Sequence, residues 1–244
     1  VLDDDPTGTQ TVYDVPVLTD WRGDSILQAF RDKYPLIYVL TNTRGFPAVE
    51  AERINREVAS ALMIAMGETG RDFHVISRSD STLRGHFPLE TDVLGEALAL
   101  DDAPLIVVPF FEEGGRVTVG DVHYVIEGDT AMPAAETPFA KDAVFGFNQS
   151  NLCDWVEEKS GGRFKSKQVI SIPLGLIRGG GPDVVAGMLR GLTEGTVCVI
   201  NAAEMRDVEV VAAAVHELWA EGRQFLFRTA ASMVRALAGL PQKP

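Results

Sequence analysis

Residues 73–85 read Phe73-His74-Val75-Ile76-Ser77-Arg78-Ser79-Asp80-Ser81-Thr82-Leu83-Arg84-Gly85, a short apolar run followed at once by a polar turn. After Ser77, this turn carries two arginines, one aspartate and three hydroxyl side chains. Guanidinium groups donate paired hydrogen bonds to carboxylate or phosphate oxygens, so the turn is suited to hold a small anion. The alternative is an ordinary strand-to-helix connection whose serines and aspartate cap the next helix. Further polar turns after other apolar runs favour the anion-binding interpretation.

Short apolar runs alternate with helical patterns from one end of the chain to the other. The runs that predict strands are Val1-Leu2, 36–41, 73–77, 105–109, 168–172, 196–201 and 224–228. Such alternation is typical of βαβ units around a mostly parallel sheet. The sequence therefore predicts an α/β fold, a Rossmann-like three-layer domain with about six or seven strands in its sheet.

Helices are predicted where apolar residues recur at helical spacing. One stripe consists of Ile54, Val58, Ala61, Leu62 and Ala65, and a second runs through Val208, Val211, Ala212, Val215, Leu218 and Trp219. The stretch 112–147 breaks the alternation because it is rich in Gly, Thr and Pro. We expect an inserted hairpin or lid there. No internal repeat or low-complexity linker divides the chain, so residues 1–244 are expected to form a single domain.

The overall charge limits the kinds of partner. A net charge of −13 and a pI near 4.7 argue against nucleic acid or an anionic membrane, because phosphate groups favour clustered Lys and Arg. No apolar run approaches the roughly 20 residues of a membrane span. Cys153 and Cys198 match no metal-binding spacing, and we expect both to be reduced thiols of a cytoplasmic protein. The expected partner is a small molecule, and the sequence leaves a homo-oligomer open.

Polar residues follow several of the predicted strands. In a parallel sheet the carboxyl ends of the strands share one edge, where ligands bind. Arginines of these turns would form a positive basin in an acidic protein: Arg44, Arg78, Arg84, Arg116 and Arg228. A carboxylate or phosphate would suit this basin. In the alternative interpretation, several of them pair with Asp3, Asp4, Asp5 and Asp80 and only hold the loops.

Known nucleotide and metal signatures are absent from the sequence. There is no GxxxxGK[ST] loop, no HExxH and no GxSxG. The stretch Gly179-Gly180-Gly181-Pro182 is not GxGxxG, and it predicts a turn before a helix. The four histidines show no metal-ligand spacing, so no metal site is predicted in this chain.

Taken together, the polar turns resemble the N-terminal domain of the four-carbon acid sugar kinases. The resemblance rests on Asp4-Asp5-Pro6-Thr7-Gly8, Asp80-Ser81-Thr82-Leu83-Arg84-Gly85, Gly115-Arg116-Val117-Thr118 and Phe227-Arg228-Thr229-Ala230-Ala231-Ser232, in that order. It implies an ATP-dependent kinase that phosphorylates a hydroxyl of an acid such as threonate, erythronate or 3-oxo-tetronate. It also implies that this domain holds the sugar acid, while a C-terminal domain absent from this sequence supplies the site for ATP and Mg²⁺. The chain alone is then expected to be inactive.

Roles for the polar residues follow from the chemistry of phosphoryl transfer, which requires positioning, charge neutralisation and a carboxylate near the attacking hydroxyl. We expect Arg44, Arg78 and Arg84 to clamp the substrate carboxylate. Asp4 or Asp5 is the expected catalytic carboxylate. The remaining expected substrate-binding residues are Asp80, Ser81, Thr82 and Arg116, of which Arg116 would reach the transferring phosphoryl group.

Two other function classes fit parts of the sequence. Val1-Leu2-Asp3-Asp4-Asp5-Pro6-Thr7 also fits the DxDxT motif of Mg²⁺-dependent haloacid-dehalogenase-like phosphatases, with Asp3 as nucleophile and Asp5 as acid/base. That chemistry needs an acidic pair after a later strand, whereas Asp101-Asp102 precedes one. The same turn mimics a calcium loop, but no helix precedes it and its twelfth position is Asp14 instead of Glu. The second of the two function classes, after the phosphatase, is a non-catalytic module that only binds sugar acids.

Overall fold

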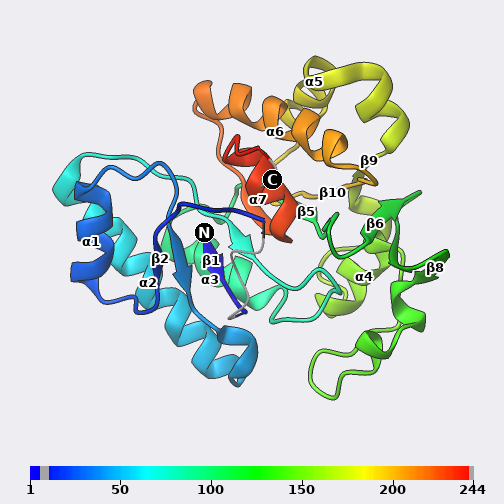
Figure 1. Ribbon diagram of the computed structural model, residues 1–244, viewed down its shortest axis with the longest axis horizontal. Coiled ribbons are helices and arrows are strands. Elements are labelled where there is room, and N and C mark those ends of the chain that lie inside the picture. Colours follow the sequence, from blue (N-terminus) through cyan, green and yellow to red (C-terminus); the bar gives the residue numbers. More distant parts are fainter. Residues whose placement is uncertain (6–10, 242–244) are drawn as a thin grey trace.

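A computed structural model describes residues 1–5 and 11–241 (Figure 1). Its main sheet has eight parallel strands in the order β2-β3-β1-β4-β11-β5-β10-β9. Their bounds are β1 Leu2–Asp3, β2 Val17–Leu18, β3 Tyr38–Leu40, β4 Ser77–Arg78, β5 Leu105–Val108, β9 Ile170–Ile172, β10 Val197–Ile200 and β11 Leu226–Thr229.

Helices cover both faces of this sheet. They are α1 Gly23–Arg31, α2 Ala48–Thr69, α3 Leu89–Ala97, α4 Leu152–Lys159, α5 Leu174–Arg190, α6 Met205–Ala220 and α7 Ala231–Leu237. Successive side chains of a strand point to opposite faces. In β5, Leu105 and Val107 accordingly pack with residues of α1 to α4, whereas Ile106 and Val108 pack with residues of α5, α6 and α7. The three-layer α/β prediction is confirmed.

The segment 112–147 contains a second, smaller sheet. Strands β6 (Arg116–Val119), β7 (Val122–Glu127) and β8 (Thr130–Pro133) are antiparallel and lie at the end of the molecule away from α1 and α2 (Figure 1). Two 3₁₀ turns follow, η2 (Ala134–Glu136) and η3 (Pro138–Lys141). The predicted hairpin is therefore present, extended by one strand. The other 3₁₀ turns are η1 (Thr43–Gly45) and η4 (Ser166–Gln168).

Two details of the main sheet differ from the prediction. The short strand β2 was not predicted, because two partly exposed residues give no periodic pattern. The run 73–77 predicted a strand, but only Ser77–Arg78 forms β4, since Leu2 pairs with Ser77 and Asp3 with Arg78. The apolar residues 75 and 76 are buried just before the paired part of the segment.

The strand order reverses at β1. From β1 the chain goes to β2 and β3 on one side, and it later crosses to β4 on the other side. Ligands of parallel sheets bind at such a reversal, beyond the carboxyl ends of the strands. The segments that follow β1, β3 and β4 meet there, beside the end of β11.

Candidate functional site

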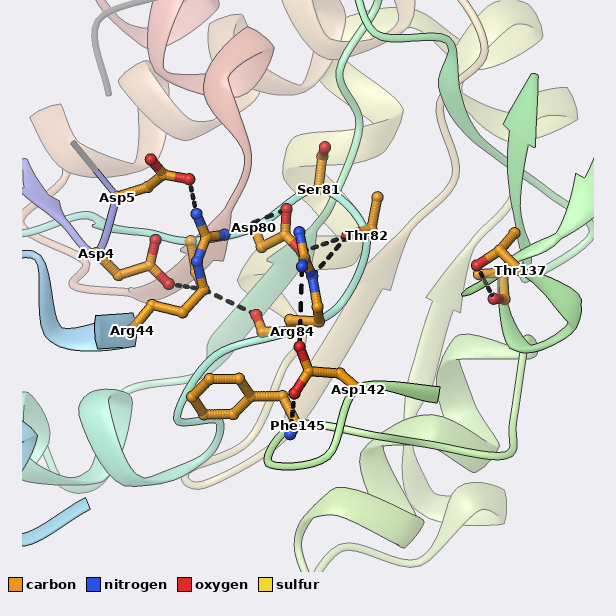
Figure 2. A network of polar contacts seen from close by, with 12 residues as sticks. Asp4, Asp5, Arg44, Asp80, Ser81, Thr82, Arg84, Thr137, Asp142 and Phe145 are labelled. Carbon is orange, nitrogen blue, oxygen red and sulfur yellow. Dashed lines mark hydrogen bonds and ion pairs between the residues drawn. The ribbon is translucent and has the colours of Figure 1, made fainter. Parts of the chain in front are cut away.

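An alternating row of acidic and basic side chains crosses the carboxyl edge of the sheet (Figure 2). Arg44, in η1 after β3, forms an ion pair with Asp5 and a second one with Asp80, with 3.3 Å between Nη1 and Oδ1. Asp80, after β4, also accepts a hydrogen bond of 2.7 Å from Nε of Arg84. Arg84 in turn lies 3.8 Å from the carboxylate of Asp142. The row therefore presents guanidinium donors and carboxylate acceptors side by side.

The turn of residues 79–85 has a fixed internal geometry. The hydroxyl of Thr82 donates to Oδ2 of Asp80, and Nε of Arg84 also lies 3.2 Å from that hydroxyl. Burial alone would raise the pKa of Asp80, but the bonds from Arg84 and Thr82 outweigh it and hold the pKa below its usual range. Asp80 is therefore an ionised acceptor at neutral pH.

Beneath this row lies a buried carboxyl pair. Asp4 is only 2% exposed, and its Oδ2 accepts a hydrogen bond of 2.6 Å from the hydroxyl of Ser79. Glu90, near the start of α3, is also buried and accepts a hydrogen bond from Thr43. Burial raises the pKa of both carboxyls, and the nearby charge of Glu90 raises that of Asp4 further. Asp4 and Glu90 therefore hold their protons to a higher pH than exposed carboxyl groups do.

Asp3 and Arg78 form a separate buried ion pair. Nη1 of Arg78 donates to Oδ1 of Asp3 over 2.9 Å, and both side chains are almost fully buried. Strand β1 ends at Asp3, so the period-two alternation that would align Asp3 with Asp5 stops there. Asp3, Asp4 and Asp5 consequently have different partners.

Two arginines at this edge have no ion pair among the described residues. Arg228 of β11 is 2% exposed and donates over 3.0 Å to the carbonyl of Arg84, with its guanidinium 5.4 Å from the ring of Trp155. Arg116, at the start of β6, lies 5.7 Å from the ring of Phe139. Arg84 approaches the same ring at 5.1 Å, so both cations contact Phe139. Within the described ranges, the buried Nε of Arg116 has no hydrogen-bond partner.

The structure brings most of the predicted site residues together. Asp4, Asp5, Arg44, Asp80, Ser81, Thr82 and Arg84 belong to one cluster at the carboxyl edge (Figure 2). Arg116 joins it through Phe139. Arg78 differs, because it is buried and donates to Asp3. Pro6, Thr7, Gly8, Thr9 and Gln10, the remainder of the first polar turn, lie outside the described residues.

Sequence reasoning missed several members of the cluster. Glu90, Phe139, Asp142 and Trp155 stand in segments without a recognisable motif. The signal available for Asp142 was its place in the inserted segment, which indicated a lid but no particular residue. For Glu90 the one hint was an acid at the start of a helix, a position that more often reflects the helix dipole.

A cavity of about 810 Å³ lies at the opposite edge of the sheet, with Phe30, Phe73 and Trp219 in its mainly apolar lining. Across residues 1–5 and 11–241, no three His, Cys, Asp or Glu side chains gather in a way that could hold a metal ion. Over the same residues, no helix is both long enough and apolar enough to cross a membrane.

The buried carboxyl of Asp4 should make stability depend on pH. Its pKa is raised in the folded state, so the folded protein binds more protons than the unfolded chain as pH rises above about 4. Stability gained at low pH is lost as pH rises through the folded-state pKa. Relative to Asp4→Asn, which does not titrate, the wild-type protein should lose about 2 kcal/mol between pH 4 and pH 7.5. Urea unfolding of both proteins at pH 4 and pH 7.5 measures their free energies of unfolding. If wild type and Asp4→Asn differ in this free energy by the same amount at both pH values, the prediction is wrong.

Comparison with known sequences gives two findings. The family model described as "Sugar-binding N-terminal domain" matches residues 1–237. A D-erythronate kinase of Heliobacterium modesticaldum is 27% identical over 219 residues, which is 87% of this chain and 46% of that protein. The chain thus spans about half the length of this curated relative.

Solved structures show the same fold. A domain of unknown function (DUF1537) from Bordetella bronchiseptica, a domain-swapped dimer with bound citrate, matches with a TM-score of 0.73 and 22% identity. The match covers 97% of this chain and 55% of that one. A Haemophilus influenzae protein of the same domain class matches with a TM-score of 0.63 and 16% identity, over 93% of this chain and 57% of that one.

Proposed function

The chain belongs to the family of sugar-binding N-terminal domains of four-carbon acid sugar kinases, and from this premise we propose that it binds a four-carbon sugar acid for phosphorylation by ATP. The supporting observation is the alternating row of Asp5, Arg44, Asp80, Arg84 and Asp142. A sugar acid carries one carboxylate, which needs guanidinium donors, and several hydroxyls, which need acceptors. Both kinds of partner lie side by side in this row.

Relatives support the substrate class. The Heliobacterium protein is a D-erythronate kinase, and erythronate is a four-carbon hydroxy acid. The citrate bound by the Bordetella protein is also a hydroxy acid. We take D-erythronate as the first probe, with threonate and 3-oxo-tetronate as the alternatives.

Arg116 is the proposed anchor for an anionic group of the ligand. Arg44 and Arg84 already have carboxylate partners, whereas the buried Nε of Arg116 has no hydrogen-bond partner among the described residues. Arg116→Met should weaken the binding of D-erythronate by about 10-fold to 100-fold, the range expected for a charged hydrogen bond. Isothermal titration calorimetry measures the change.

Arg163→Met is the matched control for this experiment. Arg163 also lies over an aromatic ring, with 4.5 Å to Phe164, but it is exposed and pairs with Asp92. Its replacement should leave the affinity unchanged. Equal affinities of the Arg116→Met variant and the wild-type protein would contradict the role of Arg116. A wild-type protein that binds none of the three acids would contradict the proposed substrate class.

We propose Asp5 as the carboxylate that faces the attacking hydroxyl. Its side chain is 17% exposed and shares Arg44 with Asp80, whereas Asp4 is buried beneath Ser79. A raised pKa gives Asp4 the character of a proton acceptor near neutral pH, so it remains the second candidate. Arg78 is proposed to support the site from below through Asp3, instead of touching the ligand.

The ATP site is proposed to lie outside this chain. The glycine-rich stretch Gly179–Gly181 lies inside α5, where Gly181 forms a kink, and does not join a strand to a helix N-terminus. We therefore propose that ATP and Mg²⁺ are held by a C-terminal domain in the whole protein, that this chain alone lacks kinase activity, and that the enzyme is cytoplasmic. Self-association is part of the same proposal, supported by the dimeric Bordetella relative.

The phosphatase alternative has weaker support. Its nucleophile would be Asp3, which is 1% exposed and held by Arg78 on the face of the sheet opposite to Arg228. A covalent nucleophile needs access to its substrate. A sugar-acid-binding module without kinase activity remains the other alternative, and ATP-dependent turnover by a protein that carries both domains distinguishes it from the kinase.

A further inference from the structure

The turn of residues 79–85 is held by buried side chains from three other segments. Asp4, after β1, accepts the hydroxyl bond of Ser79. Arg228 of β11 donates to the carbonyl of Arg84. The third contact comes from the small sheet, where Nε2 of His123 in β7 lies 2.8 Å from the carbonyl oxygen of Ser81. This last contact links the inserted segment directly to the turn that carries Asp80 and Thr82.

The protonation state of His123 follows from its two neighbours. A carbonyl oxygen can only accept, so Nε2 carries the proton and donates it to Ser81. His123 is fully buried, which lowers its pKa to about 4 and keeps the ring neutral at pH 7. Nδ1 therefore has no proton and accepts the hydroxyl of Thr118 over 2.9 Å. Both ring nitrogens are satisfied in this one tautomer.

Thr118 in turn is fixed to the main sheet. Its backbone N–H donates to Ala202 over 2.8 Å, and its carbonyl accepts from Ala202 over 3.1 Å. Ala202 follows β10 by two residues. The ring of His123 is therefore held in place when it donates to Ser81, because Thr118, His123 and Ala202 are all fully buried.

The turn needs such support because part of its backbone is unfavourable. Leu83, two residues after Ser81, has a φ of 69°, a conformation that non-glycine residues adopt rarely. Surrounding contacts must hold a residue in this region. Asp80 and Thr82 flank Ser81, so a rotation of the Ser81 carbonyl would move both side chains of the site.

We propose that His123 is a positioning residue of the sugar-acid site. It makes no contact with the ligand, and it fixes the Ser81 carbonyl so that Asp80 and Thr82 keep their orientation. The ligand-binding part of this inference rests on the proposed function, whereas the effect on the turn does not.

Two substitutions of His123 separate the two hydrogen bonds. The amide nitrogen of His123→Gln can take the place of Nε2 and donate to Ser81, whereas His123→Asn reaches only as far as Nδ1 and leaves Ser81 without its donor. Hydrogen exchange of the amides in residues 79–85 should be about 10-fold faster in the Asn variant and close to wild type in the Gln variant. D-erythronate should bind about 10-fold more weakly to the Asn variant alone, as measured by calorimetry.

His216→Asn is the matched control. Nε2 of His216 donates over 2.8 Å to the carbonyl of Leu237, a bond of the same kind at the other edge of the sheet. Its loss should not change exchange in residues 79–85. If His123→Asn does not fold, Thr118→Val tests the same support with the histidine in place, and exchange of the turn should then rise about threefold.

The outcomes separate this inference from the proposed function. A turn that exchanges equally fast in the wild-type, Gln and Asn proteins overturns the positioning role. Faster exchange spread equally over α5 and the rest of the chain also overturns it, because it would show a general loss of stability. If the wild-type protein does not bind D-erythronate, the substrate assignment fails, and the exchange experiment still decides the role of His123.

Discussion

Replacing Gly85 with alanine is expected to destabilise the protein by about 2–4 kcal/mol. Gly85 has a φ of +116°, which side-chain-bearing residues rarely adopt. A Cβ atom there would lie 2.6 Å from Oγ of Ser79 and 3.0 Å from Oδ2 of Asp4. The methyl group would thus push apart the hydrogen-bonded pair at the base of the site. Chemical denaturation measures the loss, and D-erythronate affinity should fall with it.

Gly67→Ala is the control for Gly85→Ala. Gly67 is an exposed residue in the interior of α2, and no atom apart from the neighbouring helix backbone lies within 4 Å of the added Cβ. Alanine is the better helix former, so this variant should be more stable by up to about 1 kcal/mol. A Gly85→Ala protein with wild-type stability would mean that the close approach of the backbone to Asp4 and Ser79 does not exist in solution.

Removing the buried charge of Arg228 should have a comparable effect. Arg228→Met takes a cation away from the vicinity of Asp4, Asp80 and Glu90, and it removes the donor to the Arg84 carbonyl. Loss of one member of a buried charge cluster typically costs about 3–5 kcal/mol. We expect a loss of this size at pH 7.5 in urea unfolding.

The pH dependence of this loss identifies its cause. The raised pKa values of Asp4 and Glu90 mean that both carboxyls gain protons early as pH falls, and neutral carboxyls need no counter-charge. The cost of Arg228→Met should therefore be smaller at pH 4.5 than at pH 7.5. Equal costs at both pH values would assign the effect to the lost hydrogen bond alone.

Arg223→Met is the matched control for Arg228→Met. Arg223 also lies over an aromatic ring, 5.8 Å from the centroid of Phe225, and donates to the carbonyl of Leu192. It is only half-buried and forms no ion pair among residues 1–5 and 11–241. Its replacement should cost about 1 kcal/mol with no difference between the two pH values.

The sequence by itself determined the architecture. A continuous apolar run in β5, buried on both faces, and apolar residues at helical spacing in α2 and α6 decide which side chains can be buried, and each such segment folded as predicted. Parallel strands linked by helices must gather their carboxyl ends at one edge. For this reason Asp5, Arg44, Asp80 and Arg84 could be assigned to one site before any contact was known.

Only the tertiary structure decided which charges pair. Periodicity fixes the face on which a residue lies, but an ion pair depends on distances of a few ångströms between segments far apart in sequence. Arg78 therefore pairs with Asp3, and Arg84 approaches Asp142 from the inserted segment. Glu90 and His123 come from a helix start and a small sheet whose positions no local pattern specifies. Packing of the core brings them to the site, and their burial then sets the pKa values that distinguish them from exposed residues of the same kind.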